Sequence, residues 1–239
     1  MILGDSHSKY IYYGFKNYFE NKLNYIEIGI PSWSATFMPV GKNLNDALKQ
    51  KEKIEFLFNL LKKIKFKNVL IVTRNVIYFK GNDIDSLKTI KFLNCFINKL
   101  CNNSLTYIEE MRKLISFLYS LKVKNIFYLF ENPTLNFNPI FSVLNYKFPF
   151  NFLNSNENKT TVSFLNFYIK EKNFRENLYL LAYRMKFKIL NTDPIFCDSK
   201  RCYIIKNGYI FYHDKNHISR YAAKKVVQFI DNIYKVFDY

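Results

Sequence analysis

Short apolar runs and longer segments of helical periodicity alternate along this 239-residue chain. The apolar runs predict β-strands over residues 1–3, 25–30, 68–73, 125–130 and 187–191. Apolar residues recur at helical spacing in residues 10–23, 44–64, 104–121, 164–185 and 218–234, with Ser104 as a candidate N-cap. Strands that alternate with helices in this order predict an α/β sandwich built on a parallel sheet.

The segments between these elements predict loops and one hairpin. Residues 132–160 are rich in Asn, Pro and Phe and show no clear period, so we interpret them as a long loop, a lid or an insertion. Residues 203–212 predict a β-hairpin that turns at Asn207-Gly208. The sequence shows no internal repeat and no domain boundary, and we expect a single domain over residues 1–239.

Composition changes this picture little. The hydrophobic content of 49% is ample for a core, and the net charge is +17. The lysines are spread along the chain and accompany abundant Asn, Ile, Phe and Tyr, which is typical of a coding bias; no nucleic-acid motif accompanies them, so we expect no nucleic-acid partner. No apolar run is long enough to span a membrane, and Asp5 interrupts the opening apolar run, so we expect no transmembrane segment and no signal peptide in this chain.

The four cysteines form two close pairs. Cys197 and Cys202 are near enough to close a small disulfide loop, although two reduced thiols fit the spacing equally well. Cys95 and Cys101 lie in a segment with helical character, where a spacing of six places them on different faces; we therefore expect buried thiols. Neither pair has the companion ligands of a zinc site, and we expect no metal and no cofactor.

The three histidines lie only near the two ends of the chain. Ser6 follows the first predicted strand in Gly4-Asp5-Ser6-His7, at the strand end where parallel sheets gather functional groups. Asp214 precedes His217 by three residues, so its carboxylate can hold one ring nitrogen while the other points to a serine. Each motif alone also fits a structural role: a plain turn at Ser6, or an N-cap at Asp214 beside a surface histidine. Together they predict a Ser–His–Asp triad.

These motifs resemble one family, the SGNH (GDSL-like) hydrolases. The best match is the SGNH domain attached to membrane acyltransferases of the acyltransferase-3 type, which O-acetylate bacterial surface polysaccharides. The opening Ile2-Leu3-Gly4-Asp5-Ser6-His7-Ser8 is similar to the family's nucleophile block. The similar residues near the other end are Asp193-Pro194, Cys197, Cys202, Gly208, Tyr212, Asp214, His217-Ile218-Ser219 and Ala223. Between the ends, Glu131-Asn132-Pro133 and residues 177–182 also look similar.

The resemblance implies a three-layer α/β/α sandwich around a central, mostly parallel five-stranded sheet. It implies Ser6 as the nucleophile, His217 as the general base and then acid, and Asp214 as the carboxylate that orients the imidazole. Because Cys197 and Cys202 belong to the same pattern, we expect them to form a disulfide.

The resemblance also implies an oxyanion hole, where this chain departs from the family. The expected donors are the backbone N–H of Ser6, a backbone N–H at Ser34 or Ser32, and the side-chain amide of Asn75. Thr73 stands where the family usually has Gly, and the related subfamily often has Trp at the position of Asn75. A turn-forming Asn is the alternative interpretation of that residue.

Three further residues near these motifs have two interpretations each. Arg74 either holds an anionic or polyhydroxy substrate or is a solvated side chain at a strand end. Trp33, the only tryptophan, either stacks on a sugar ring or packs in the core. We interpret His7 as a support of the turn, and not as a second base.

The resemblance predicts a serine acyltransferase that moves an acetyl or short acyl group from an acyl donor to a bacterial cell-surface glycan. An esterase with the same triad is the alternative, and an inactive glycan-binding module is a third interpretation. A membrane acyltransferase domain or subunit is the expected protein partner. The expected location is the extracytoplasmic or periplasmic face of the cell envelope.

Overall fold

The structure is a computed structural model, and it describes residues 1–19, 24, 26–30, 33–83, 88–97, 101–135, 137–140, 142 and 160–234. The chain divides into two compact units, and each is described here by itself. The first unit comprises Met1–Lys9, Tyr25–Glu131 and Asn173–Leu190. The second comprises Tyr10–Asn24, Asn132–Lys172 and Asn191–Tyr239. Most of the loop expected over residues 132–160 lies outside the described residues, and the single domain stays a prediction.

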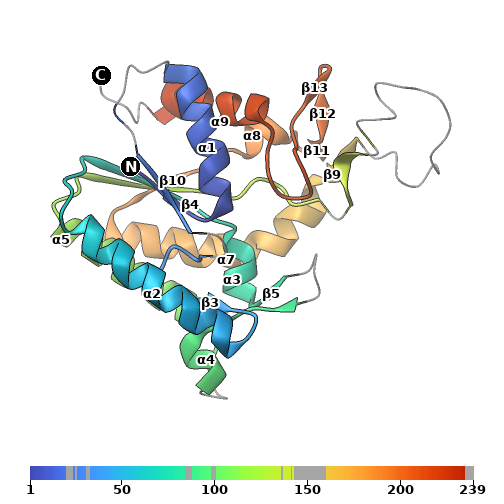
Figure 1. The fold of residues 1–239 in the computed structure, drawn as a ribbon. Coiled ribbons are helices and arrows are strands. Elements are labelled where there is room, and N and C mark those ends of the chain that lie inside the picture. Colours follow the sequence, from blue (N-terminus) through green and yellow to red (C-terminus); the bar gives the residue numbers. More distant parts are fainter. Residues whose placement is uncertain are drawn as a thin grey trace. The chain divides into compact units, whose positions relative to one another are not determined.

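The first unit contains a five-stranded sheet in the order β10-β8-β4-β1-β2, and each neighbouring pair is parallel. Figure 1 labels β4 and β10 of this sheet. The strands are β1 (Ile2–Gly4), β2 (Glu27–Gly29), β4 (Asn68–Val72), β8 (Asn125–Leu129) and β10 (Lys188–Leu190). All five predicted strands are present, and the predicted α/β fold with a central parallel sheet is confirmed. Because the strands are parallel, their carboxyl ends share one edge of the sheet.

Three long helices share one hydrophobic core with this sheet. They are α2 (Leu44–Leu61), α5 (Asn103–Ser120) and the second half of α7 (Phe164–Met185). On β4, Val69 and Ile71 belong to this core, and the alternate residues Leu70 and Val72 are buried as well. The strand is therefore buried on both faces, as its continuous apolar run predicts.

Asparagines begin two of these helices. The side chain of Asn43 accepts a hydrogen bond from the Asp46 backbone N–H at the start of α2. The side chain of Asn102 does the same for Leu105 at the start of α5. The prediction of Ser104 as the N-cap is wrong, because its hydroxyl donates to the Phe79 carbonyl instead.

Short elements occupy the connections of the first unit. They are β3 (Val40–Gly41), α3 (Asn75–Lys80), β5 (Asn82–Asp83), β6 (Lys88–Thr89), β7 (Lys91–Phe92) and α4 (Leu93–Ile97). Their length of two to six residues is too short for a period to be seen in the sequence. Helix α3 follows β4 directly and ends at Gly81, which adopts a φ of 75°.

Cys95 and Cys101 form a disulfide, so the prediction of separate buried thiols is wrong. That prediction assumed one continuous helix through both residues. In the structure α4 ends at Ile97 and α5 begins at Asn103, and the two cysteines therefore do not share a helix.

The second unit joins α1 (Ser6–Phe19), from Tyr10 onward, to α9 (Arg220–Tyr234). A Cβ atom at Gly14 would lie 2.4 Å from the Ala223 carbonyl oxygen, so this glycine permits close approach of the two helices. One helical turn farther along α1, the hydroxyl of Tyr18 donates to the Asp231 carboxylate at 3.2 Å.

A hairpin, a strand pair and a short helix also belong to the second unit. They are β12 (Ile205–Lys206) with β13 (Tyr209–Ile210), β9 (Thr161–Ser163) with β11 (Arg201–Tyr203), and α8 (Asp193–Phe196). Asn207 and Gly208 have φ values of 51° and 79°, which is the left-handed conformation that a two-residue hairpin turn requires. The predicted hairpin is confirmed.

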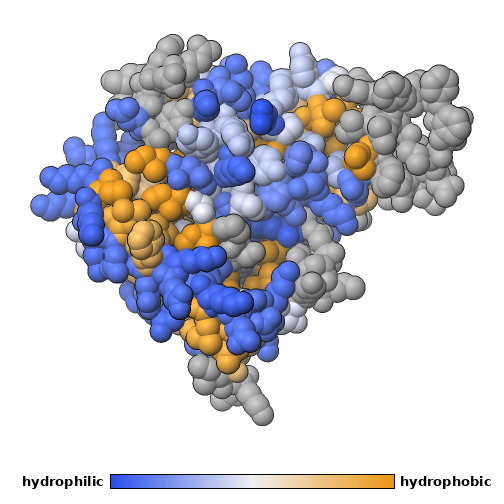
Figure 2. Space-filling model, in the orientation of Figure 1, coloured by the Kyte–Doolittle hydropathy of each residue, from blue (hydrophilic) through white to orange (hydrophobic). Residues whose placement is uncertain are grey.

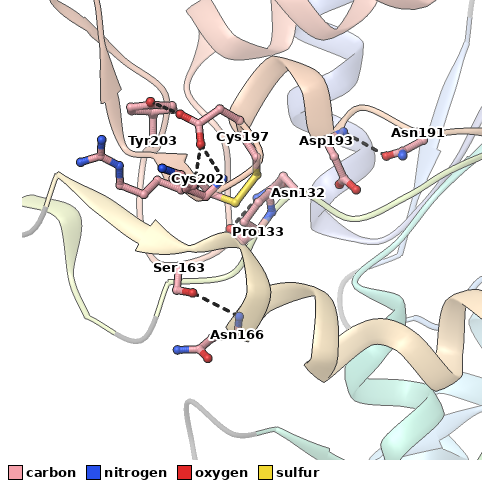
Figure 3. Close-up of a disulfide and its surroundings, with 12 residues drawn as sticks. Asn132, Pro133, Ser163, Asn166, Asn191, Asp193, Cys197, Cys202 and Tyr203 are labelled. Atoms are coloured by element: carbon pink, nitrogen blue, oxygen red, sulfur yellow. Dashed lines mark hydrogen bonds between the residues drawn. A yellow bond between two sulfur atoms is a disulfide. The ribbon is translucent and has the colours of Figure 1, made fainter.

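Cys197 and Cys202 form a disulfide beside α8 (Figure 3). The loop that it closes is also held by Asp198, whose carboxylate accepts the Lys200 and Arg201 backbone N–H groups and the Tyr203 hydroxyl. Covalent and polar contacts thus fix the same short segment.

Hydrophilic residues cover most of the face shown in Figure 2, with smaller apolar patches between them. Exposed apolar side chains include Phe56 on α2 and Leu105 on α5. Among the described residues, no helix is both long enough and apolar enough to span a membrane.

Gly14→Ala tests the close approach of α1 and α9. Alanine normally favours a helix by about 1 kcal/mol over glycine, but here its Cβ would meet backbone atoms of Ala223 that cannot move independently. We expect a net loss of about 1–3 kcal/mol in unfolding free energy, measured by urea denaturation. Asn17→Ala, at an exposed position of the same helix, is the control. An unchanged midpoint for Gly14→Ala would show that the helices separate easily.

Candidate active site

Ser6 is the first residue of α1, and only Asp5 separates it from the end of β1. It therefore lies at the carboxyl edge of the sheet, with the backbone N–H groups of the first helical turn around it. Its side chain is exposed, whereas Asp5 and His7 on either side are buried. The turn thus presents a hydroxyl to solvent between two buried polar groups.

The carboxylate of Asp5 fixes this turn. Its Oδ1 accepts the His7 backbone N–H at 2.8 Å and lies 3.0 Å from His7 Nδ1. Its Oδ2 accepts the Arg74 backbone N–H at 2.9 Å and the Tyr78 hydroxyl at 3.3 Å. Asp5 therefore joins the turn that carries Ser6 to the turn between β4 and α3.

Asp5 and His7 stabilise each other's charged forms. Burial by itself raises the pKa of Asp5, but the charge and hydrogen bonds of His7 and the Arg74 N–H outweigh it, and the net pKa is lowered. Burial by itself lowers the pKa of His7, but the Asp5 carboxylate outweighs it, and the net pKa is raised. The contact with Asp5 therefore favours the protonated form of His7, and His7 supports the turn.

Arg74 and Glu131 form a second buried pair in the same region. Arg74 Nε lies 3.7 Å from Glu131 Oε1, and the two side chains are 11% and 2% exposed. The interpretation of Arg74 as a solvated side chain is therefore wrong. Its role in substrate binding stays a prediction, and Glu131 already neutralises its charge.

The structure describes only some of the residues expected to donate hydrogen bonds to the oxyanion. Asn75 begins α3 at the carboxyl end of β4, as expected, but its side chain lies outside the described part of the structure. Ser34 is buried and its hydroxyl lies 2.7 Å from Thr36 Oγ1. Ser32 lies outside the described residues. Trp33 is fully buried and its indole N–H donates to the Thr36 carbonyl, so it packs in the core and does not offer a surface to a sugar.

Asp214 and His217 meet in the second unit. Asp214 Oδ2 lies 2.7 Å from His217 Nδ1, and its Oδ1 accepts the backbone N–H groups of Asn216 and His217. Burial raises the pKa of Asp214, but these hydrogen bonds outweigh it and hold the pKa well below its usual value. The N-cap of α9 is Ser219, which accepts the Ala222 N–H at 3.1 Å. The carboxylate of Asp214 is therefore committed to the imidazole and its loop.

Sequence reasoning missed three contacts at this imidazole and in the segments beside it. The ring of Tyr10 stacks on His217 with centroids 4.8 Å apart. The side-chain amide of Asn132 donates to the Asn216 carbonyl at 3.0 Å, and the Tyr212 hydroxyl donates to the Pro133 carbonyl. The sequence signals were the similarity of Asn132-Pro133 and of Tyr212 to the family pattern, which named no function for them.

Ser6 belongs to the first unit, and Asp214 and His217 belong to the second. The Asp–His half of the triad has the required geometry, and its pairing with Ser6 stays a prediction. Among the residues that the structure describes, no three His, Cys, Asp or Glu side chains gather as metal ligands would.

The chain has a parallel sheet with a serine turn at its edge, and it has a hydrogen-bonded Asp–His pair. These are the kinds of residue that serine hydrolases use. The family model described as "SGNH domain (fused to AT3 domains)" matches residues 1–232, and the chain belongs to this family.

Among solved structures, the fold is similar to the periplasmic domain of the lipopolysaccharide acetyltransferase of Salmonella ser. Paratyphi A. The TM-score is 0.64 at 15% sequence identity, and the match covers 98% of this chain and 83% of that one. No curated protein matches the sequence.

His7→Asn tests the buried ion pair. Because the pKa of His7 is raised, its protonated form stabilises the fold below its ordinary pKa of 6.5, and this contribution is lost as pH rises through the raised pKa. We expect His7→Asn to lower the unfolding free energy by about 3–5 kcal/mol at pH 6 and by less at pH 9, in urea titrations. The control is His213→Asn at an exposed histidine. Equal losses at both pH values would argue against a charged His7.

Proposed function

We propose that this chain is a serine O-acyltransferase that moves an acetyl or short acyl group onto a bacterial cell-surface glycan through an acyl-Ser6 intermediate. The observation that carries the proposal is the Asp214–His217 pair, whose 2.7 Å contact orients an imidazole as a general base requires. The similar Salmonella domain belongs to a lipopolysaccharide acetyltransferase, which supports the same reaction class here.

The proposed reaction has two steps. Ser6 Oγ attacks the acyl carbonyl of the donor while His217 Nε2 takes its proton, and Asp214 stabilises the imidazolium through Nδ1. The oxyanion accepts hydrogen bonds from the Ser6 N–H and from the proposed donors at Ser34 and Asn75. Collapse breaks the bond to the donor's leaving group, which receives the proton and departs. A glycan hydroxyl then attacks the carbonyl of acyl-Ser6 and gives its proton to His217. The acyl–Oγ bond breaks as the new ester forms, and His217 returns the proton to Ser6 Oγ.

The same groups also serve an esterase. The side chain of Ser6 is exposed, and water in place of the sugar hydroxyl would release a free acid in the second step. The two functions therefore differ in the acceptor alone, and the ratio of acylated glycan to free acid distinguishes them.

We further propose an extracytoplasmic location, with an AT3-type membrane domain as partner. Two disulfides support it, because such bonds persist in oxidising compartments. The family description names fusion to AT3 domains, and the similar Salmonella domain is periplasmic.

Ser6→Ala tests the nucleophile. We expect kcat for p-nitrophenyl acetate to fall by roughly 10⁴-fold or more, and labelling by a fluorophosphonate to disappear, because the proposed mechanism uses Ser6 Oγ as its nucleophile. His217→Ala should have a similar effect, and Asp214→Asn a smaller one.

Ser199→Ala and His213→Ala are the matched controls, because both side chains are exposed. Added glycan acceptor should divert the acyl group from water to the sugar in the unmodified protein. Turnover that survives in Ser6→Ala would refute the proposed mechanism.

The thiol state tests the location. Protein taken from its native host without reductant should resist a maleimide reagent at all four cysteines, and each should become reactive after reduction and unfolding. Four thiols that react before reduction would contradict an oxidising compartment.

A further inference from the structure

A cavity of about 420 Å³ lies within the second unit, between the β12–β13 hairpin, α8 and α9. Its size falls in the range of small-ligand sites, about 300–1,000 Å³. None of its lining residues has a part in the acyl transfer proposed above. The lining combines three kinds of group: a tyrosine pair, two lysines and several side-chain amides.

The tyrosine pair is held in a fixed orientation. The rings of Tyr209 and Tyr221 lie 4.2 Å apart and only 4° from parallel. The buried ring of Phe211 meets Tyr221 edge-on, with centroids 5.8 Å apart. Tyr209, in contrast, is 52% exposed. A ring fixed from one side and open to solvent offers a flat apolar surface with little loss of side-chain entropy on binding.

Both charged side chains of the cavity are cationic. They are Lys206 on the hairpin and Lys225 on α9, and the eleven lining residues include no Asp or Glu. Lys206 Nζ lies 5.2 Å from the ring centroid of Tyr203, and Lys225 Nζ lies 5.8 Å from that of Tyr221. Aromatic rings hold the two ammonium groups without neutralising them, so the cavity favours an anion.

Side-chain amides supply the remaining polar groups. Asn207, Gln228 and Asn232 line the cavity, and Gln228 Oε1 lies 3.5 Å from Lys225 Nζ. Each amide offers a donor and an acceptor, which is what a pair of neighbouring hydroxyl groups requires.

We propose that this cavity binds an acidic saccharide unit. The apolar face of a pyranose ring packs on Tyr209, its carboxylate meets Lys206 and Lys225, and its hydroxyls bond the amides. The choice of a saccharide over other small anions rests on the proposed function, whose acceptor is a glycan. The cavity thus holds the acceptor chain at a point outside the reacting groups.

The binding test uses the whole ¹⁵N-labelled chain, titrated with tri-galacturonate and observed by NMR, with maltotriose as the neutral probe. We expect tri-galacturonate to bind at least tenfold more tightly, with shift changes in residues 205–210 and 221–232. Lys225→Gln and Lys206→Gln should each weaken tri-galacturonate about tenfold and leave maltotriose unchanged. Tyr209→Ala should weaken both probes.

Lys224→Gln is the matched control, because it removes the same charge from the neighbouring exposed position of α9 outside the cavity. Equal affinity for both trisaccharides would overturn the proposal. It would also be overturned if inorganic phosphate or a nucleoside monophosphate bound as tightly as tri-galacturonate, or if Lys224→Gln weakened binding as much as Lys225→Gln.

Turnover of p-nitrophenyl acetate separates this inference from the proposed function. Lys225→Gln should retain it, and Ser6→Ala should lose it while still binding tri-galacturonate. A chain that binds the acidic probe without turnover that depends on Ser6 would refute the proposed function and leave the cavity assignment standing. Normal turnover of p-nitrophenyl acetate without binding of tri-galacturonate would refute the cavity assignment and leave the proposed function standing.

Discussion

The carboxylate of Asp5 is the constraint on which the candidate active site depends. It is buried, so its charge is tolerated only because donors surround it: two N–H groups of the backbone, the His7 ring and the Tyr78 hydroxyl. Two of these donors come from the turn that follows β1, and two come from the region that follows β4. Because one carboxylate satisfies both, the two turns keep a fixed distance, and the hydroxyl of Ser6 is presented from a rigid base.

The chain uses an Asp–His pair twice, and the surroundings give each pair a different task. In the Asp5–His7 pair, both side chains are less than a tenth exposed, and Asp5 Oδ1 lies 3.0 Å from His7 Nδ1. In the Asp214–His217 pair the side chains are 45% and 20% exposed. A buried imidazole is closed to a substrate, whereas a partly exposed one is open to it. The same two residue types therefore provide a structural anchor at one end of the chain and a candidate base at the other.

Sequence patterns predicted what depends on local periodicity. The five strands, the α7 bounds and the turn at Asn207-Gly208 follow from apolar spacing and backbone preference. The Cys95–Cys101 disulfide did not follow, because a helical period across both cysteines hid the break between α4 and α5. The hydrogen-bond partners of Asp5 could not be predicted from the sequence either. Tyr78 is 73 residues away, and nothing in its own segment signals a bond to a distant carboxylate. Long-range polar contacts are determined by packing, which the sequence pattern does not express.

One serine connects the candidate base to the cavity. Ser219 caps α9, donates its N–H to the Phe211 carbonyl at 2.8 Å, and donates its hydroxyl to the Ile210 carbonyl at 2.6 Å. Ser219 thereby bonds the hairpin that carries Tyr209 to the start of the helix that carries Lys225. Ser219 itself lies two residues after His217 in the sequence. All of these groups belong to the second unit, so the distance from the imidazole to the cavity is set by local bonds. A saccharide held in the cavity would then be fixed with respect to the base, and recognition of the acceptor and its deprotonation would depend on one small rigid segment.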